Sequence, residues 1–173
     1  MKLIPAVAAI CAIALPVSGQ STAKSVAAHR TSEQMTVDGH LTESAWSEAA
    51  PATGFIQREP DELAAATERT VFRVVYSENT IYIGVYCLDG SPAAFVSKEM
   101  ERDAPLYRDD SVAVVLDTFA DRRNAYTFET NVNGARFDAL ITDEGRNVLK
   151  EWDGVWNVAA RRAPDGWVAE FAI

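Results

Sequence analysis

The chain has 173 residues, of which 48% are hydrophobic, so it can bury one sizeable core and is not an intrinsically disordered chain. Its formal net charge of −9 repels phosphate backbones, and no basic stripe offsets it, which excludes nucleic acid as a partner. The chain has two cysteines, Cys11 and Cys87, and Cys11 lies in the N-terminal segment that we expect to be cleaved off, as described next. Cys87 then remains alone in an apolar strand, where we predict a small buried hydrophobic residue.

Residues 1–19 have the composition of a secretion signal. A positive charge at Lys2 precedes an apolar run over 3–17, and small residues follow it. The run is shorter than the roughly 20 residues that span a bilayer, which favours a cleavable signal over an uncleaved anchor. We expect cleavage after Gly19 or after Ala23, and export to the periplasm, the outer membrane or the extracellular space.

Residues 20–35 are small and polar, and we interpret them as a flexible lead-in to a single domain over 36–173. The domain is predicted to open with a short helix over 43–49, with Thr42 as its N-cap. Trp46 lies among alanines in this helix, which favours an anchor in the hydrophobic core over a ligand platform.

Strand patterns dominate the rest of the chain. Short runs rich in Val, Ile, Tyr and Phe are separated by turn signals such as Asn133-Gly134. The predicted strands are 70–77, 80–88, 111–117, 125–131, 135–142, 155–162 and 166–173. They predict an all-β fold, an antiparallel, jelly-roll-like β-sandwich with a short N-terminal helix; a closed barrel is the alternative.

Three segments carry recognisable motifs in a fixed order. Residues 37–46 read VDGHLTESAW, residues 108–118 read RDDSVAVVLDT, and residues 166–173 read GWVAEFAI. They are similar to the patterns V-D-G-x-L-x-E-x-x-W, D-D-x-V-x-V-x-L-D and G-W-x-x-E-x-x-I-P, the last without its proline. Together they resemble family 9 carbohydrate-binding modules over roughly 36–173. The resemblance implies a β-sandwich that binds polysaccharide or oligosaccharide without cleaving it, in proteins linked to polysaccharide breakdown or uptake.

Residues 117–126 (DTFADRRNAY) look closer to one bacterial group of this family. In that group the module follows a signal peptide and precedes a region that resembles an outer-membrane β-barrel. The chain ends inside the strand pattern 166–173, so we expect it to be a fragment of a longer polypeptide. A C-terminal barrel in the same polypeptide is therefore an expected partner.

In sugar-binding members of the family, two aromatic rings sandwich the terminal sugar, and part of that site follows the last motif. Neither ring has a clear match here, so the candidate binding residues come from residue chemistry. An aromatic ring packs on sugar C–H bonds, and carboxylates accept hydroxyl protons. On that basis we predict sugar contacts from Trp152, Asp153, Arg108, Asp109 and Asp110. The neighbouring Trp156 falls within a strand and is predicted to be core.

Other functions are weaker matches to the sequence. Asp109 and Asp110 could instead bind Ca²⁺ or form a strand-end cluster with Arg102 or Arg108, and no EF-hand spacing is present. No cofactor is predicted beyond this calcium option.

The chain has two histidines and no convincing catalytic set, so we predict no enzyme activity for it. Two alternatives to sugar binding remain. One is an accessory domain of an outer-membrane barrel, without a sugar ligand. The other is a haem-binding sandwich with Met100 and either Lys98 or His40 as ligands, although we expect Met100 to fill a gap in packing.

Overall fold

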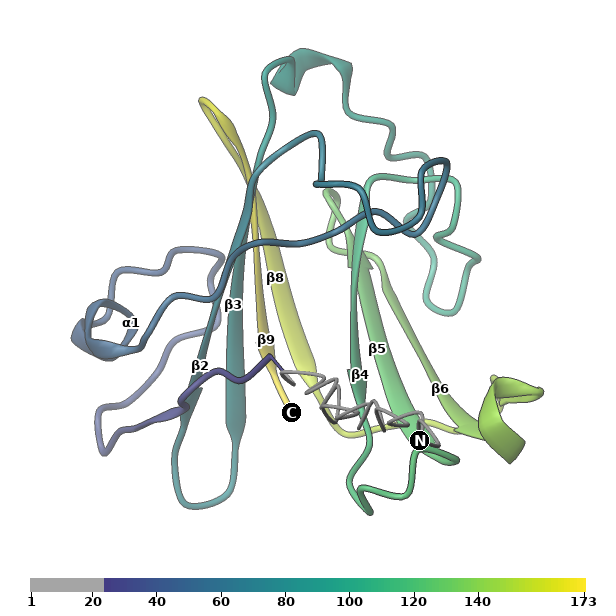
Figure 1. Ribbon diagram of the computed structural model, residues 1–173. Helices are drawn as coiled ribbons and strands as arrows, with labels where there is room; N and C mark the ends of the chain where they lie inside the picture. The colour runs from purple at the N-terminus through teal and green to yellow at the C-terminus, as the bar shows by residue number, and fades with distance from the viewer. Residues whose placement is uncertain (1–23) are drawn as a thin grey trace, which may run out of the picture.

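The computed structural model describes residues 24–173; the predicted signal over 1–19 lies outside the described residues. Two β-sheets stand face to face as a sandwich (Figure 1). The five-stranded sheet has the order β1-β2-β3-β9-β8 and the four-stranded sheet the order β4-β5-β6-β7. The sandwich prediction is confirmed, and the closed-barrel alternative is wrong because no strand pairing joins the two sheets in the described residues.

The strands are short, and seven of them follow the predicted runs closely. Their bounds are β1 His29–Arg30, β2 Thr70–Tyr76, β3 Ile81–Leu88, β4 Ser111–Leu116, β5 Ala125–Asn131, β6 Arg136–Thr142, β7 Asn147–Leu149, β8 Asn157–Ala163 and β9 Gly166–Ala172. All pairings are antiparallel except β1 with β2. Two short 3-10 turns, η1 (Pro92–Ala94) and η2 (Asp143–Gly145), lie in the connections.

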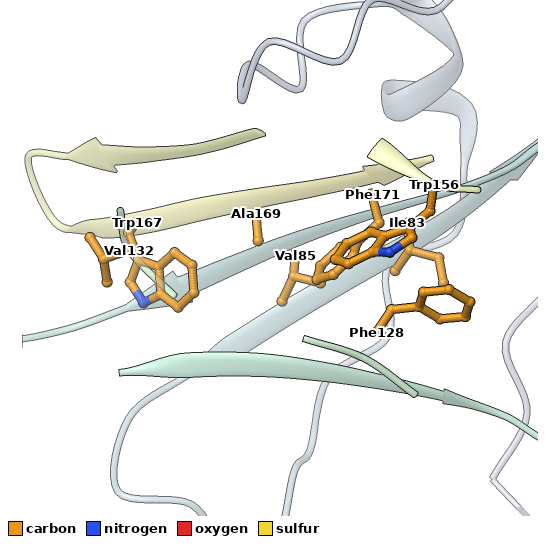
Figure 2. Close-up of a cluster of buried hydrophobic side chains, with 8 residues drawn as sticks. All are labelled: Ile83, Val85, Phe128, Val132, Trp156, Trp167, Ala169 and Phe171. Carbon is orange, nitrogen blue, oxygen red and sulfur yellow. The ribbon is translucent and has the colours of Figure 1, made fainter. Parts of the chain in front are cut away.

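Aromatic side chains fill the space between the sheets (Figure 2). Trp156 lies at the entry to β8, stacks on Phe171 of β9 at 6.0 Å between ring centroids, and meets the edge of Phe128 at 5.3 Å. It is 7% exposed, as predicted for a core residue. Successive residues of a strand face opposite sides, so Phe128 and its register partner Asp138 both face inward.

A second, smaller core covers the outer face of the five-stranded sheet. Helix α1 (Ser44–Glu48) buries Trp46 against this face, with 2% of the side chain exposed, which confirms the predicted anchor. Gly84 of β3 makes room for it, because a Cβ there would lie 2.7 Å from Leu41 and 3.1 Å from the Trp46 ring. Within residues 24–173 the helices are too short and too polar to cross a bilayer.

The start of the domain differs from the prediction in two ways. Thr42 is not the N-cap; the cap position is Glu43, without a side-chain bond, and the Glu33 carboxylate accepts hydrogen bonds from Ser44 Oγ and Ala45 N instead. Residues 29–35, expected in the flexible lead-in, are ordered: His29–Arg30 form β1, the Glu33 carboxylate bonds the start of α1, and Met35 packs against the small core around Trp46. The polar sequence of this segment gives no sign that it is ordered, because its partners lie in α1 and β2.

Candidate functional site

The predicted residues Trp152 and Asp153 lie in the connection from β7 to β8. The Trp152 ring is half-buried and packs 4.8 Å from Tyr126 and 6.0 Å from Phe128, both side chains of the inner face of β5. A Cβ at Gly154 would lie 2.8 Å from the same ring. Trp152 therefore contributes to the packing between the sheets at the edge of the core.

Asp153 is held by an ion-pair network. Arg102 contacts Asp153 at 2.8 Å and the fully buried Asp138 at 2.7 Å, and the second oxygen of Asp138 accepts a 2.6 Å bond from Gly154 N. Burial disfavours the charge of Arg102, but its contacts with Asp153, Asp138 and Asp103 together raise its pKa above the ordinary value. The network ties the loop over 95–110 to the Trp152–Gly154 segment.

Asp109 and Asp110 hold the other end of that loop. Asp109 Oδ2 accepts bonds from the backbone N–H groups of Lys98 and Glu99, both at 3.0 Å, and from the Asn131 side chain at 2.8 Å. Burial opposes the Asp109 charge, but these bonds prevail and lower its pKa. Asp110 accepts a 2.6 Å bond from Val96 N. Both carboxylates thus shape the loop from within.

The bonds that Asp109 accepts from Lys98, Glu99 and Asn131, called the Asp109 clamp below, hold a loop that presents two side chains to solvent. Asp109 N donates to Leu106 O at 2.9 Å, which closes a tight turn with Tyr107 and Arg108 at its corners. Leu106 is 2% exposed and anchors the turn, whereas Tyr107 is 72% exposed. The Arg108 guanidinium lies 5.3 Å from the Tyr107 ring centroid, over one face of the ring. The pair is a fixed aromatic ring with a charged hydrogen-bond donor beside it.

The two groups of predicted residues are linked through the loop over 95–110. In residues 24–173 no hydrogen bond or ion pair joins Trp152 or Asp153 to residues 108–110 directly. Sequence analysis missed Tyr107 as a candidate. The available signal was its place in Pro105-Leu106-Tyr107-Arg108, immediately before the β4 motif, but sequence could not tell which of Leu106 and Tyr107 is buried.

The metal and haem options gain no support from the described residues. Residues 24–173 hold no group of three His, Cys, Asp or Glu side chains placed for a metal ion. Met100 is 76% exposed, so the prediction that it fills a packing gap is wrong, and His40 is also exposed. Cys87 faces inward on β3, and burial raises the pKa of its thiol to about 11, as expected of an unreactive residue.

The chain also matches a known family. The family model described as "Carbohydrate family 9 binding domain-like" matches residues 37–173, which include the whole of the sandwich apart from β1. The chain belongs to this family. No curated protein sequence matches it.

Three solved structures share the fold of this family 9 domain. Two are of a carbohydrate binding module family 9 from Caldicellulosiruptor kristjanssonii, in complex with cellotriose and with glucose, each with a TM-score of 0.59 and 16% identity. They match 84% and 85% of this chain, which spans 65% and 68% of theirs. The third is a putative carbohydrate-binding protein from Bacteroides uniformis, with a TM-score of 0.64, 12% identity and coverage of 86% and 73%.

Proposed function

We propose that this domain is a non-catalytic carbohydrate-binding module. The observation that carries the proposal is the family match over residues 37–173, which spans both sheets of the sandwich. Two solved structures with this fold are described as complexes with cellotriose and with glucose. A module of this kind directs the polypeptide that carries it to polysaccharide.

The Tyr107–Arg108 turn is the surface that we assign to the sugar. Arg108 covers one face of the exposed Tyr107 ring, which leaves the other face for the C–H bonds of a pyranose ring. The Arg108 guanidinium can donate to sugar hydroxyls. The buried Leu106 and the Asp109 clamp fix the turn before a ligand arrives, so little ordering entropy is lost on binding.

The other predicted contacts take supporting roles in this proposal. Trp152 packs on Tyr126, and Asp153 pairs with Arg102, so both position the loop over 95–110. Asp109 and Asp110 fold the same loop from the inside. Of the predicted sugar-binding residues, Arg108 alone keeps its direct role, and Tyr107 joins it.

Isothermal titration calorimetry with glucose and cellotriose tests the assignment. Stacking of one sugar on one ring contributes about 1–2 kcal/mol, so we expect Tyr107→Ala to weaken binding by about 5- to 30-fold. Phe119→Ala is the matched control, because Phe119 is also an aromatic residue, 73% exposed, in the loop that follows β4. It should leave the affinity unchanged.

Two results would count against the proposal. If neither sugar binds at millimolar concentration, carbohydrate is the wrong ligand class, and the accessory role beside an outer-membrane barrel becomes the better interpretation. If sugar binds and Tyr107→Ala has no more effect than Phe119→Ala, the function stands but the site lies elsewhere. Trp152→Ala would then test whether sugar binds beside Trp152, at the edge of the core.

We also propose that the protein is exported and works in polysaccharide breakdown or uptake. The support is the signal-like composition of residues 1–19. N-terminal sequencing of the protein from periplasmic and extracellular fractions should give a first residue of Gln20 or Lys24. Recovery of the protein from the cytoplasmic fraction alone, with residues 1–19 intact, would contradict the export proposal.

A further inference from the structure

The outer face of the five-stranded sheet carries a cavity of about 610 Å³ that the sugar proposal does not use. It lies between the segment over 39–47 and the β8–β9 hairpin, on the side of this sheet that faces away from the four-stranded sheet. Its wall and floor include His40, Trp46, Arg73, Tyr86, Arg161 and Val168.

Strand register explains the arrangement of these side chains. Tyr86, Val168 and Arg161 are successive partners across β3, β9 and β8, so they share the outer face in one row. Arg73 of β2 lies opposite Gly84 in another row. The two arginines therefore come from strands on opposite sides of the cavity, with Tyr86 and Val168 between them.

The segment over 39–47 comes very close to the sheet at two glycines, Gly39 in the segment itself and Gly84 in β3. A Cβ at Gly39 would lie 3.1 Å from Arg161 Cβ, so the chain passes close to that arginine. The missing Cβ of Gly84 lets Leu41 and Trp46 sit directly on β3. These close approaches make the cavity a built feature of the domain, with one arginine at each side.

Two donor atoms at the cavity lack acceptors. Arg73 Nε and Trp46 Nε1 are buried and have no hydrogen-bond partner in the described residues. Neither Arg73 nor Arg161 forms an ion pair within residues 24–173, although the chain has 25 acidic residues. The nearby Asp165 accepts from the Tyr86 hydroxyl. Unpartnered buried donors favour an acceptor-rich ligand.

We propose that this cavity binds the carboxylate of an acidic sugar unit, a uronic-acid residue of an oligosaccharide. Guanidinium groups pair with carboxylates through charge-assisted, often bidentate bonds, and Arg73 and Arg161 supply them. The Tyr86 ring and Val168 offer an apolar surface to the sugar ring. The choice of a saccharide rests on the carbohydrate-binding function proposed above, whereas the choice of a carboxylate rests on the arginines.

The test compares three probes on the full chain by calorimetry: trigalacturonic acid, its methyl ester and inorganic phosphate. We expect the acid to bind at least about tenfold more tightly than the uncharged ester, because a charge-assisted pair is lost. Arg161→Gln, at an exposed position that should not disturb folding, is expected to weaken the acid by about tenfold. Arg146→Gln, also exposed but at the end of the η2 turn, is the matched control and should have no effect.

Each outcome has a defined meaning. Equal binding of acid and ester, no binding of the acid, or no response to Arg161→Gln would overturn the proposal. Phosphate binding as tight as that of the acid would overturn the saccharide assignment and leave a general anion site. Tyr107→Ala separates this cavity from the proposed neutral-sugar site: it should weaken cellotriose and leave trigalacturonic acid unchanged, so either proposal can fail without the other.

Discussion

Glu170 of β9 makes the stability of this domain depend on pH. Its side chain is fully buried, and Oε2 accepts bonds from the backbone N–H groups of Asp38 and Gly39, both at 3.0 Å. Burial raises the pKa of Glu170 from 4.5 to about 7; the two N–H bonds oppose this rise, and the nearby carboxyls of Glu43 and Asp38 add to it. The folded protein therefore holds a proton that the unfolded chain releases near pH 4.5.

The sign of the effect follows from that difference in bound protons. Between pH 4.5 and about 7 the folded state keeps the Glu170 proton and the unfolded state does not, so the free energy of unfolding falls as pH rises. At about 1.4 kcal/mol for each pKa unit, the whole shift corresponds to a loss of roughly 3 kcal/mol, complete just above pH 7. Below pH 4.5 both states are protonated, and this contribution is fully present.

Glu170→Gln isolates the contribution. The amide oxygen can still accept from Asp38 N and Gly39 N but carries no charge, so we expect the variant to match the wild type near pH 5 and to exceed it by roughly 1–3 kcal/mol at pH 8. Urea unfolding followed by tryptophan fluorescence at pH 5, 6, 7 and 8 measures the difference. Glu78→Gln, at an exposed turn, is the control. Parallel pH profiles for Glu170→Gln and the wild type would refute the reasoning.

Two further predictions concern the backbone. Gly166→Ala places a Cβ 2.0 Å from Cys87 O, so we expect the unfolding free energy to fall by at least about 3 kcal/mol. Gly54→Ala is the control: its Cβ meets no atom within 4 Å, so it should cost only about 1 kcal/mol for its φ of +76°. Equal losses in urea unfolding would contradict the steric argument. Asp109→Ala leaves the N–H groups of Lys98 and Glu99 without their acceptor, so we expect a loss of about 1–3 kcal/mol and faster proteolysis within residues 95–108; unchanged cleavage there would show that the clamp does not hold the loop.

Local patterns in the sequence were sufficient for most of the strands. Ala125–Asn131 has the predicted bounds, because turn residues flank it and its inward side carries Tyr126, Phe128 and Thr130 at every second position. The core positions of Trp46 and Trp156 were also predicted, since a large apolar ring among small or strand-forming residues is usually buried. These features depend on neighbours within a few residues.

The short strands and the candidate sites depended on distant partners. The pairing of His29–Arg30 with β2 has no local pattern, because two residues are too few to show alternation. Trp152 and Asp153 were predicted to contact sugar, but Trp152 packs on Tyr126, and Asp153 pairs with Arg102 of a loop some fifty residues earlier.

The sequence by itself thus determined the fold class, the order of the main strands and the family resemblance, each of which is written in local periodicity and short motifs. Only the tertiary structure decided which polar and aromatic side chains reach solvent. Leu106 and Tyr107 are adjacent in one loop, yet one is buried and the other exposed. The turn that contains them is held by the bonds that Asp109 accepts from Lys98, Glu99 and Asn131, and bonds between residues this far apart leave no signature in the local sequence.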